Sequence, residues 1–141
     1  GGGCKMYQHI LLPVALDHET AFTDSMEIAR RLCADGGKLT LLHVIETVPG
    51  YVAAQMPAGA LEEAQSATTR QVEDMARGAG ADVGWAVISG SPGSAIVEYA
   101  EQNKADCIVM ASHKPGLTDY FLGSTAARVV RHAPCSVHVI R

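Results

Sequence analysis

A polar, glycine-containing segment in the last quarter of the chain has the residue types best suited to binding a small anion. It reads ASHKPGLTDYFLGSTAARVV from Ala111 onward, and Gly123, Ser124 and Thr125 stand where a helix is predicted to begin. The first N–H groups of a helix lack partners within it and carry partial positive charge, so they bind phosphate well. The two hydroxyls add donors and Lys114 adds a full charge. A Gly-Ser pair at a helix start is equally typical of an ordinary cap, so both interpretations stay open.

Other chemistry finds less support in the spacing of residues. The histidines are His9, His18, His43, His113, His132 and His138. None is paired with a ligand three or four residues away on one helix, and no HExxH is present, so we predict structural roles for all but His113, which lies in the polar loop. The cysteines are Cys4, Cys33, Cys107 and Cys135. Without CxxC pairs they indicate free thiols in a reducing compartment, acting mainly as small buried hydrophobic groups.

A nucleophilic serine is not indicated either. The chain lacks GxSxG, and the segment Gly90-Ser91-Pro92-Gly93 is better explained as a turn followed by a helix cap. We therefore predict no catalytic residue.

Five apolar segments of strand length must position these groups. They are HILLPV near residue 10, KLTLLHVI near 40, VGWAVIS near 85, DCIVMAS near 108 and SVHVI at the end. Between them lie helix-length segments with apolar residues three and four apart, such as Phe22, Met26 and Ala29. The alternation predicts a single-domain α/β protein in which right-handed crossovers place helices on both faces of a mostly parallel sheet. In such sheets ligands lie at the carboxyl ends of the strands.

Helix boundaries are also marked in the sequence. Asp17 is a candidate cap for a helix running to about Ala34, with Gly36-Gly37 ending it. Ser91 and Pro92 are typical of an N-cap followed by proline at the first helical position. The long second connection, residues 46–60, is predicted to be a mobile surface loop before a helix over 61–76.

Composition excludes several classes of function. A net charge of −4 and a pI near 5.8 provide no basic surface for nucleic acid. No apolar run approaches the roughly 20 residues that span a bilayer, and the start lacks a signal-peptide pattern, so we expect a cytoplasmic protein without a membrane segment. Residues 1–5 are expected to be an expression remnant or a disordered lead-in, and 6–141 the folded domain.

Several segments together resemble the universal stress protein family. IVMASH from Ile108 and GSTAARVVRHAPCSV from Gly123 closely resemble its signature, and ILLPV, LLHVIE and the Gly90-Ser91-Pro92 turn fall where the family has equivalents. The resemblance covers nearly the whole chain. It implies one universal stress protein domain over 6–141, with an open five-stranded Rossmann-like sheet of the adenine nucleotide alpha hydrolase-like type and strand order 3-2-1-4-5.

The resemblance further implies that an adenine nucleotide binds at the ends of the first and fourth strands. The residues implied to contact it are Pro13, Val14, Val44, Met110, Ala111, His113, Lys114, Gly123, Ser124 and Thr125. Those of the first two strands would flank the adenine, with the Val44 backbone mimicking a base pair to the purine edge. Those after the fourth strand would line the ribose and phosphates. For Val44 and Met110, plain strand core is an equally open interpretation.

Two departures from the family pattern bear on this site. In nucleotide-binding members the pattern G-x-x-G is followed by nine residues and then by G-S or G-T. In this chain Ala111 and Lys114 replace the first two glycines, and only eight residues separate Lys114 from Gly123. The Ala-Ser-His-Lys-Pro loop is instead similar to a subclass associated with ATP binding. Such relatives also commonly carry an aspartate where this chain has Ala15. Asp17 is a candidate replacement, or simply the helix cap.

The implied function is a regulatory module of a stress response that binds ATP, with Mg²⁺ or Mn²⁺ held mainly by the phosphates. At most slow ATP hydrolysis is expected, because His113 and Asp17 are the only candidate bases. The resemblance and the exposed final strand imply a homodimer formed through that strand, with a protein partner of unknown identity. The alternative is a dimeric interaction module whose pocket is degenerate and binds no nucleotide.

Overall fold

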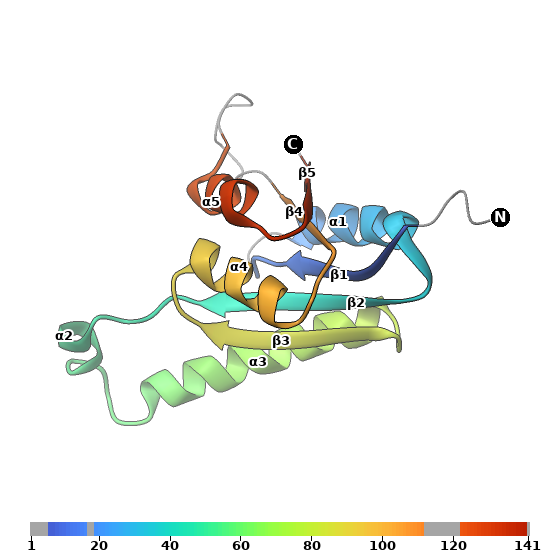
Figure 1. Ribbon diagram of the computed structural model, residues 1–141. Helices are drawn as coiled ribbons and strands as arrows, with labels where there is room; N and C mark the ends of the chain where they lie inside the picture. The colour runs from blue at the N-terminus through green and yellow to red at the C-terminus, as the bar shows by residue number, and fades with distance from the viewer. Residues whose placement is uncertain (1–5, 17–18, 112–121, 141) are drawn as a thin grey trace.

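The structure is a computed structural model that describes residues 6–16, 19–111 and 122–140. Five parallel strands form one sheet in the order β3-β2-β1-β4-β5, which confirms the predicted order (Figure 1). The strands are β1 Tyr7–Pro13, β2 Cys33–Ile45, β3 Val83–Ser89, β4 Cys107–Ala111 and β5 Ser136–Ile140. Because β1 lies in the middle, the apolar run ILLP is flanked by strands on both sides, as its composition predicts.

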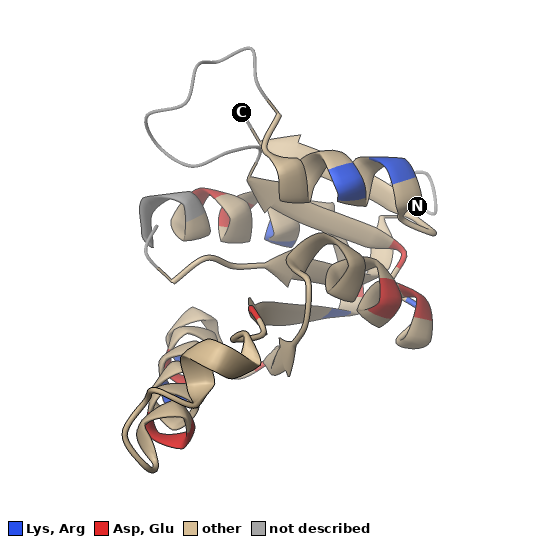
Figure 2. Ribbon diagram, turned by 90° about the vertical axis from the view of Figure 1, so that its left-hand side faces the viewer, with Lys and Arg blue, Asp and Glu red and all other residues tan. Residues whose placement is uncertain are grey.

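Helices cover both faces of this sheet. They are α1 Glu19–Leu32, α2 Gly50–Ala53, α3 Ala60–Ala79, α4 Pro92–Gln102 and α5 Ser124–His132. Helices α1 and α3 pack on one face, and α4 and α5 pack side by side on the other, as Figures 1 and 2 show. The short helix α2 stands beyond the carboxyl end of β2, away from the sheet (Figure 1).

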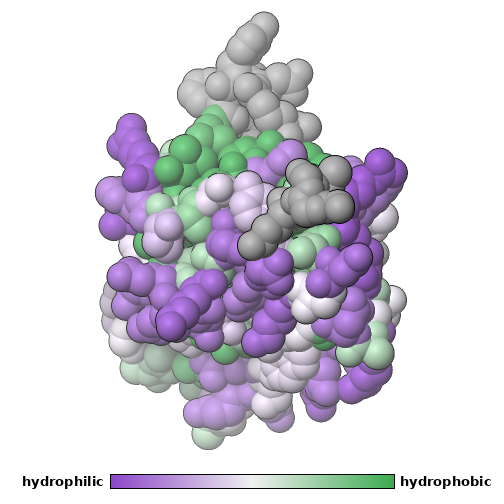
Figure 3. Space-filling view, turned by 45° about the vertical axis from the view of Figure 1, so that its right-hand side comes forward, coloured by the Kyte–Doolittle hydropathy of each residue, from purple (hydrophilic) through white to green (hydrophobic). Residues whose placement is uncertain are grey.

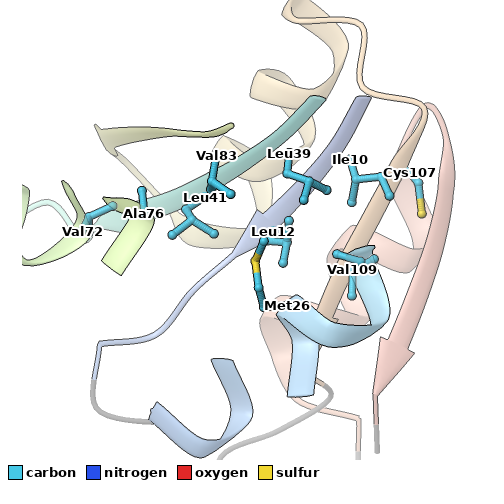
Figure 4. Close-up of a cluster of buried hydrophobic side chains, with 11 residues drawn as sticks. Ile10, Leu12, Met26, Leu39, Leu41, Val72, Ala76, Val83, Cys107 and Val109 are labelled. Carbon is cyan, nitrogen blue, oxygen red and sulfur yellow. The ribbon is translucent and has the colours of Figure 1, made fainter. Parts of the chain in front are cut away.

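The core is divided by the sheet into two clusters of buried side chains. On the face of α1 and α3, one cluster joins Ile10 and Leu12 of β1 with Met26 of α1 and Val72 of α3 (Figure 4). On the other face, Leu11 belongs with Ile96, Ala100, Ala126 and Val129, among others. Alternate residues of β1 thus face opposite clusters, and Ile10, Leu11 and Leu12 are fully buried. Burial of this kind, about 25 cal/mol per Å² of apolar surface, is the main force holding the helices to the sheet.

Two boundaries differ from the sequence prediction. Helix α1 ends at Leu32 rather than near Ala34, and Cys33 already belongs to β2, where it pairs with Tyr7. The register then shifts, because the next pair joins His9 to Lys38, and Gly36 within this shift has a φ of 78°. Pairing with the central strand therefore overrides the local helix signal. In the second connection, predicted to be a loop, the chain forms α2, and α3 extends from Ala60 to Ala79.

Polar side chains at the amino ends of the strands hold the sheet together. The Asp106 carboxylate accepts hydrogen bonds from the backbone N–H groups of Gln8 and His9, at 2.8 and 2.9 Å. His9 Nδ1 lies 3.0 Å from the Asn103 carbonyl oxygen, which can only accept, so this nitrogen carries a proton. Its Nε2 lies 3.2 Å from the Thr40 hydroxyl. These contacts confirm a structural role for His9.

The described thiols agree only in part with the prediction of small buried groups, because Cys33 and Cys135 are half-buried. Cys33, Cys107 and Cys135 are free, and Cys107 is buried in the core. Burial raises the pKa of the Cys107 thiol to about 12, so this group is protonated and unreactive at neutral pH. Burial also raises the pKa of Cys33 and Cys135. Among the residues that the structure describes, no group of three His, Cys, Asp or Glu side chains is placed to hold a metal ion.

Candidate functional site

The strand order reverses next to β1, which marks the place where open α/β sheets bind ligands. The chain runs outward through β2 and β3 on one side of β1, then returns to add β4 and β5 on the other. The residue pairs between β1 and β4 extend only to Leu11 and Ile108, whereas β1 and β2 remain paired as far as Pro13 and Leu42. The switch point therefore lies between the carboxyl ends of β1 and β4. Figure 2 looks onto this edge of the sheet.

The backbone that follows β1 is held in place by β2. The Val14 N–H donates to the Leu42 carbonyl oxygen at 2.9 Å. The Nδ1 of His43 lies 2.9 Å from the Val14 carbonyl oxygen, and this nitrogen must donate because a carbonyl only accepts. Both backbone polar groups of Val14 are thus paired. His43 thus holds the Val14 backbone in place. The sequence predicted only a structural role for this histidine, because its partner is a backbone atom and no motif indicates it.

The structure places the side chains of Val44 and Met110 in the core. Val44 is half-buried and pairs with Ile88 of β3, while Met110 is 5% exposed, and both pack in the cluster beneath α4 and α5. This packing agrees with the strand-core interpretation of both side chains, and contact with a nucleotide stays a prediction. Any contact of Val44 with a base must therefore come from its backbone or from the edge of its side chain.

The start of α5 is the part of the site that offers binding groups. Gly123 is the N-cap, and its carbonyl oxygen accepts the first intrahelical bond from the Ala127 N–H at 2.8 Å. Within the part of the chain that the structure describes, no side chain caps this end, and no acidic residue lies in the first turn of α5. Ser124 is exposed and Thr125 is half-buried. The predicted helix start is thus confirmed, and it places the first backbone N–H groups of α5 and the hydroxyls of Ser124 and Thr125 at the carboxyl edge of the sheet.

The remaining candidates fall into two groups. Pro13 and Ala111 are the last residues of β1 and β4, at the switch point, and Ala111 pairs with Ile140 of β5. His113, Lys114 and Asp17 lie outside the described residues. The structure thus brings the ends of β1, β2 and β4 and the start of α5 to one edge of the sheet, as the sequence predicts.

Helix α4 begins at the same edge and contacts α5 there. Ser91 occupies its N-cap position without a capping side-chain hydrogen bond, and Pro92 is its first residue, as predicted. The Nε of Arg128 in α5 donates to the Ser94 hydroxyl at 2.7 Å. Sequence analysis missed this pair. The available signal was the position of Arg128, one helical turn after Ser124.

Comparison with known proteins assigns the fold to one family. The model of the universal stress protein family matches residues 6–141. A universal stress protein of Methanocaldococcus jannaschii is 31% identical over 147 residues, covering 99% of this chain and 85% of that protein. The solved structure of the universal stress protein UspA from Lactobacillus plantarum superimposes with a TM-score of 0.69 at 28% identity, covering 97% of this chain and 99% of that one.

Two solved structures of similar fold contain an adenine nucleotide. One is a universal stress protein in complex with cAMP, with a TM-score of 0.60 over 97% of this chain and 98% of that one. The other, from Archaeoglobus fulgidus, is in complex with dAMP, with a TM-score of 0.56 over 97% of this chain and all of that one. Both are 21% identical to this chain, so the likeness is one of fold.

Proposed function

The chain belongs to the universal stress protein family, and we propose that it is a regulatory module that binds ATP at the carboxyl ends of β1 and β4. The observation that carries the proposal is the start of α5. Among the described residues, this helix end has no side-chain cap, its first turn has no carboxylate, and it lies at the edge where the strand order reverses. A phosphate chain would satisfy the N–H groups and the partial positive charge found there.

The adenine would lie on the β1–β2 side of the switch point. The contacts of Val14 with Leu42 and His43 hold the backbone after β1 in one position, which favours recognition of a flat base. Related folds bind cAMP and dAMP, and these two ligands share the adenine base and a phosphate group. In ATP the triphosphate would extend from there toward Gly123, Ser124 and Thr125.

A divalent cation would be held mainly by the phosphates, because the described residues contain no cluster of metal ligands. Nucleotide occupancy would change the surface offered to a protein partner, so that binding rather than turnover is the function. We place this function in the cytoplasm, where the free thiols would stay reduced.

A second candidate is an interaction module with a degenerate pocket. It is favoured by Ala15, which is exposed at a position where nucleotide-binding relatives commonly carry aspartate. The replacement of glycine by Ala111 and Lys114 points the same way. This candidate predicts a folded protein without measurable affinity for nucleotides.

Calorimetric titration separates the two candidates. We expect ATP to bind the wild-type protein with a dissociation constant in the micromolar to low millimolar range, about −4 to −8 kcal/mol. AMP should bind more weakly, because it lacks two of the phosphates, and GTP should bind more weakly because its purine edge presents a different pattern of donors and acceptors. Titrations with and without Mg²⁺ show whether the cation contributes. Heat changes no larger than dilution for all three nucleotides would instead support the degenerate pocket.

The edge strand β5 is the proposed interface of a homodimer. It pairs only with β4, leaving the backbone groups of its outer edge without a strand partner among the described residues. Val137, Val139 and Ile140 are half-buried, and Val130 of α5 is 47% exposed. Figure 3 shows apolar side chains gathered near the top of the molecule, where β5 and α5 lie in Figure 1. Pairing of two β5 strands would cover this surface.

A charge at the edge of this interface should weaken the dimer. Arg128 contacts α4, so Val130, two residues further along α5, faces the opposite side, toward the β5 edge. We expect Val130→Asp to raise the dimer dissociation constant about 10-fold in sedimentation velocity, because the carboxylate would be desolvated in the interface. Val52→Asp is the matched control, since Val52 is an exposed valine (39%) on α2. Equal sedimentation of both variants and wild type would place the interface elsewhere.

A further inference from the structure

We infer that Arg128 is a specificity-determining residue that makes the site prefer a polyphosphate chain to an uncharged nucleoside, and that Ser94 positions its guanidinium. The inference rests on the proposed function and adds a residue from the second half of α5 together with one from α4. Its basis is the contact of Arg128, one turn into α5, with the first turn of α4 at the carboxyl edge of the sheet.

The guanidinium of Arg128 is fixed at one end and available at the other. Its Nε donates to the Ser94 hydroxyl at 2.7 Å, and Ser94 lies in the first turn of α4. The two terminal nitrogens carry four further N–H donors. No ion pair links Arg128 to an acidic side chain within residues 6–16, 19–111 and 122–140. Among the described residues these four donors therefore have no carboxylate partner, and they can serve a ligand with oxygen atoms.

The aliphatic part of the Arg128 side chain packs closely against Gly93. A Cβ atom built on Gly93, which is buried, would lie 2.9 Å from both Cβ and Cδ of Arg128 and 3.2 Å from its Cγ. The absence of a side chain at Gly93 is thus what lets the arginine lie against α4. Packing along the stem reduces the conformational freedom of the guanidinium, and less entropy is lost when it binds a ligand.

Arg128 also shares a face of α5 with the proposed phosphate site. It follows Ser124 by one turn, and residues at this spacing are neighbours on a helix surface. Long side chains on a helix lean toward its N-terminus, so the guanidinium is directed toward the end where Gly123 and Ser124 lie. Its bond to the first turn of α4 places it at the same edge of the sheet.

The charges at the starts of α4 and α5 differ from those at the start of α3. Helix α3 has Glu62 and Glu63 in its first turn, the usual compensation for the positive end of the helix dipole. The first turns of α4 and α5 have no acidic residue, and a guanidinium lies between them. Departures from local charge rules are expected at functional sites. A triphosphate would balance all three sources of positive potential, whereas adenosine would balance none.

Titrations of charge-matched variants test the inference. We expect Arg128→Gln to weaken ATP binding about 10-fold, the effect of losing charge-assisted hydrogen bonds, and to change adenosine binding less than about twofold. Ser94→Ala should weaken ATP binding about threefold, because the guanidinium is no longer held. Arg131→Gln is the control: it removes the same charge from the last turn of α5 and should leave ATP affinity within about twofold.

Three controls make the outcome decisive. Glutamine keeps most of the aliphatic part of the side chain against Gly93, and thermal unfolding checks that each variant folds. Arg128→Lys keeps the charge but loses the Nε hydrogen bond, so its ATP affinity should lie between those of the wild type and Arg128→Gln. Unchanged ATP affinity in Arg128→Gln overturns the inference and leaves the proposed function standing. Inorganic tripolyphosphate separates the remaining cases. If it binds the wild type as tightly as ATP and depends on Arg128, the inference stands and adenine recognition fails. If neither ATP nor tripolyphosphate binds, both proposals fail.

Discussion

Replacing Gly123 by valine should weaken ATP binding by at least about 100-fold while leaving the fold intact. Gly123 has φ −58° and ψ 156°, a conformation open to any residue, so the backbone does not require glycine there. What the site requires is the absence of a side chain, because a phosphate must approach the N–H groups that begin α5. A β-branched side chain would block that approach, and losing two charge-assisted hydrogen bonds of about 1.5–3 kcal/mol each accounts for the size of the effect.

The measurement is calorimetric titration with ATP, combined with urea unfolding. The unfolding free energy of Gly123→Val should fall by no more than about 1 kcal/mol, the usual cost of a poorer N-cap. Gly78→Val is the control, because Gly78 lies in the last turn of α3 with no atoms within 4 Å of a Cβ built on it. It should bind ATP as the wild type does. Binding by Gly123→Val within about threefold of the wild type would contradict the phosphate site assigned to α5.

Two identical substitutions at helical glycines should change stability in opposite directions. At Gly93 a new Cβ would meet the Cβ of Arg128 at 2.9 Å, and that atom is bonded to the α5 backbone and cannot swing aside. Helices α4 and α5 would have to move apart, so Gly93→Ala should lower the free energy of unfolding by about 2 kcal/mol, as overpacking does. Gly78→Ala places the same methyl group in open space and should raise it by about 0.5–1 kcal/mol.

Urea unfolding of the two variants provides the comparison. Both should show the wild-type dependence on denaturant, with shifts in the midpoint alone, because the surface exposed on unfolding is unchanged. If Gly93→Ala were as stable as Gly78→Ala, the close contact between α4 and Arg128 would not exist in solution. That result would also remove the structural basis for positioning the guanidinium.

The architecture could be predicted because the local signals agree with one another. Continuous apolar runs such as ILLPV indicate strands flanked on both sides, and the alternation with helices admits few topologies. The start of α5 was also readable, since Gly123 and Ser124 open a segment of helical period. The end of α1 could not be predicted in this way, because Cys33 belongs to β2 and pairs with Tyr7, a residue distant in sequence. Pairing energy of that kind has no signature within a local window.

Sequence by itself determined which residues reach the carboxyl edge, since strand period and helix caps are local properties of the chain: Pro13, Val14, Ala111, Gly123 and Ser124 are there for that reason. Tertiary structure alone decided which side chains contact one another across different elements. It turned Val44 and Met110 into the core, gave His43 the Val14 carbonyl as its partner, and brought Arg128 against Gly93 and Ser94. The physical reason is that these contacts arise from packing between elements separated along the chain, and no residue's own preference specifies its distant neighbours.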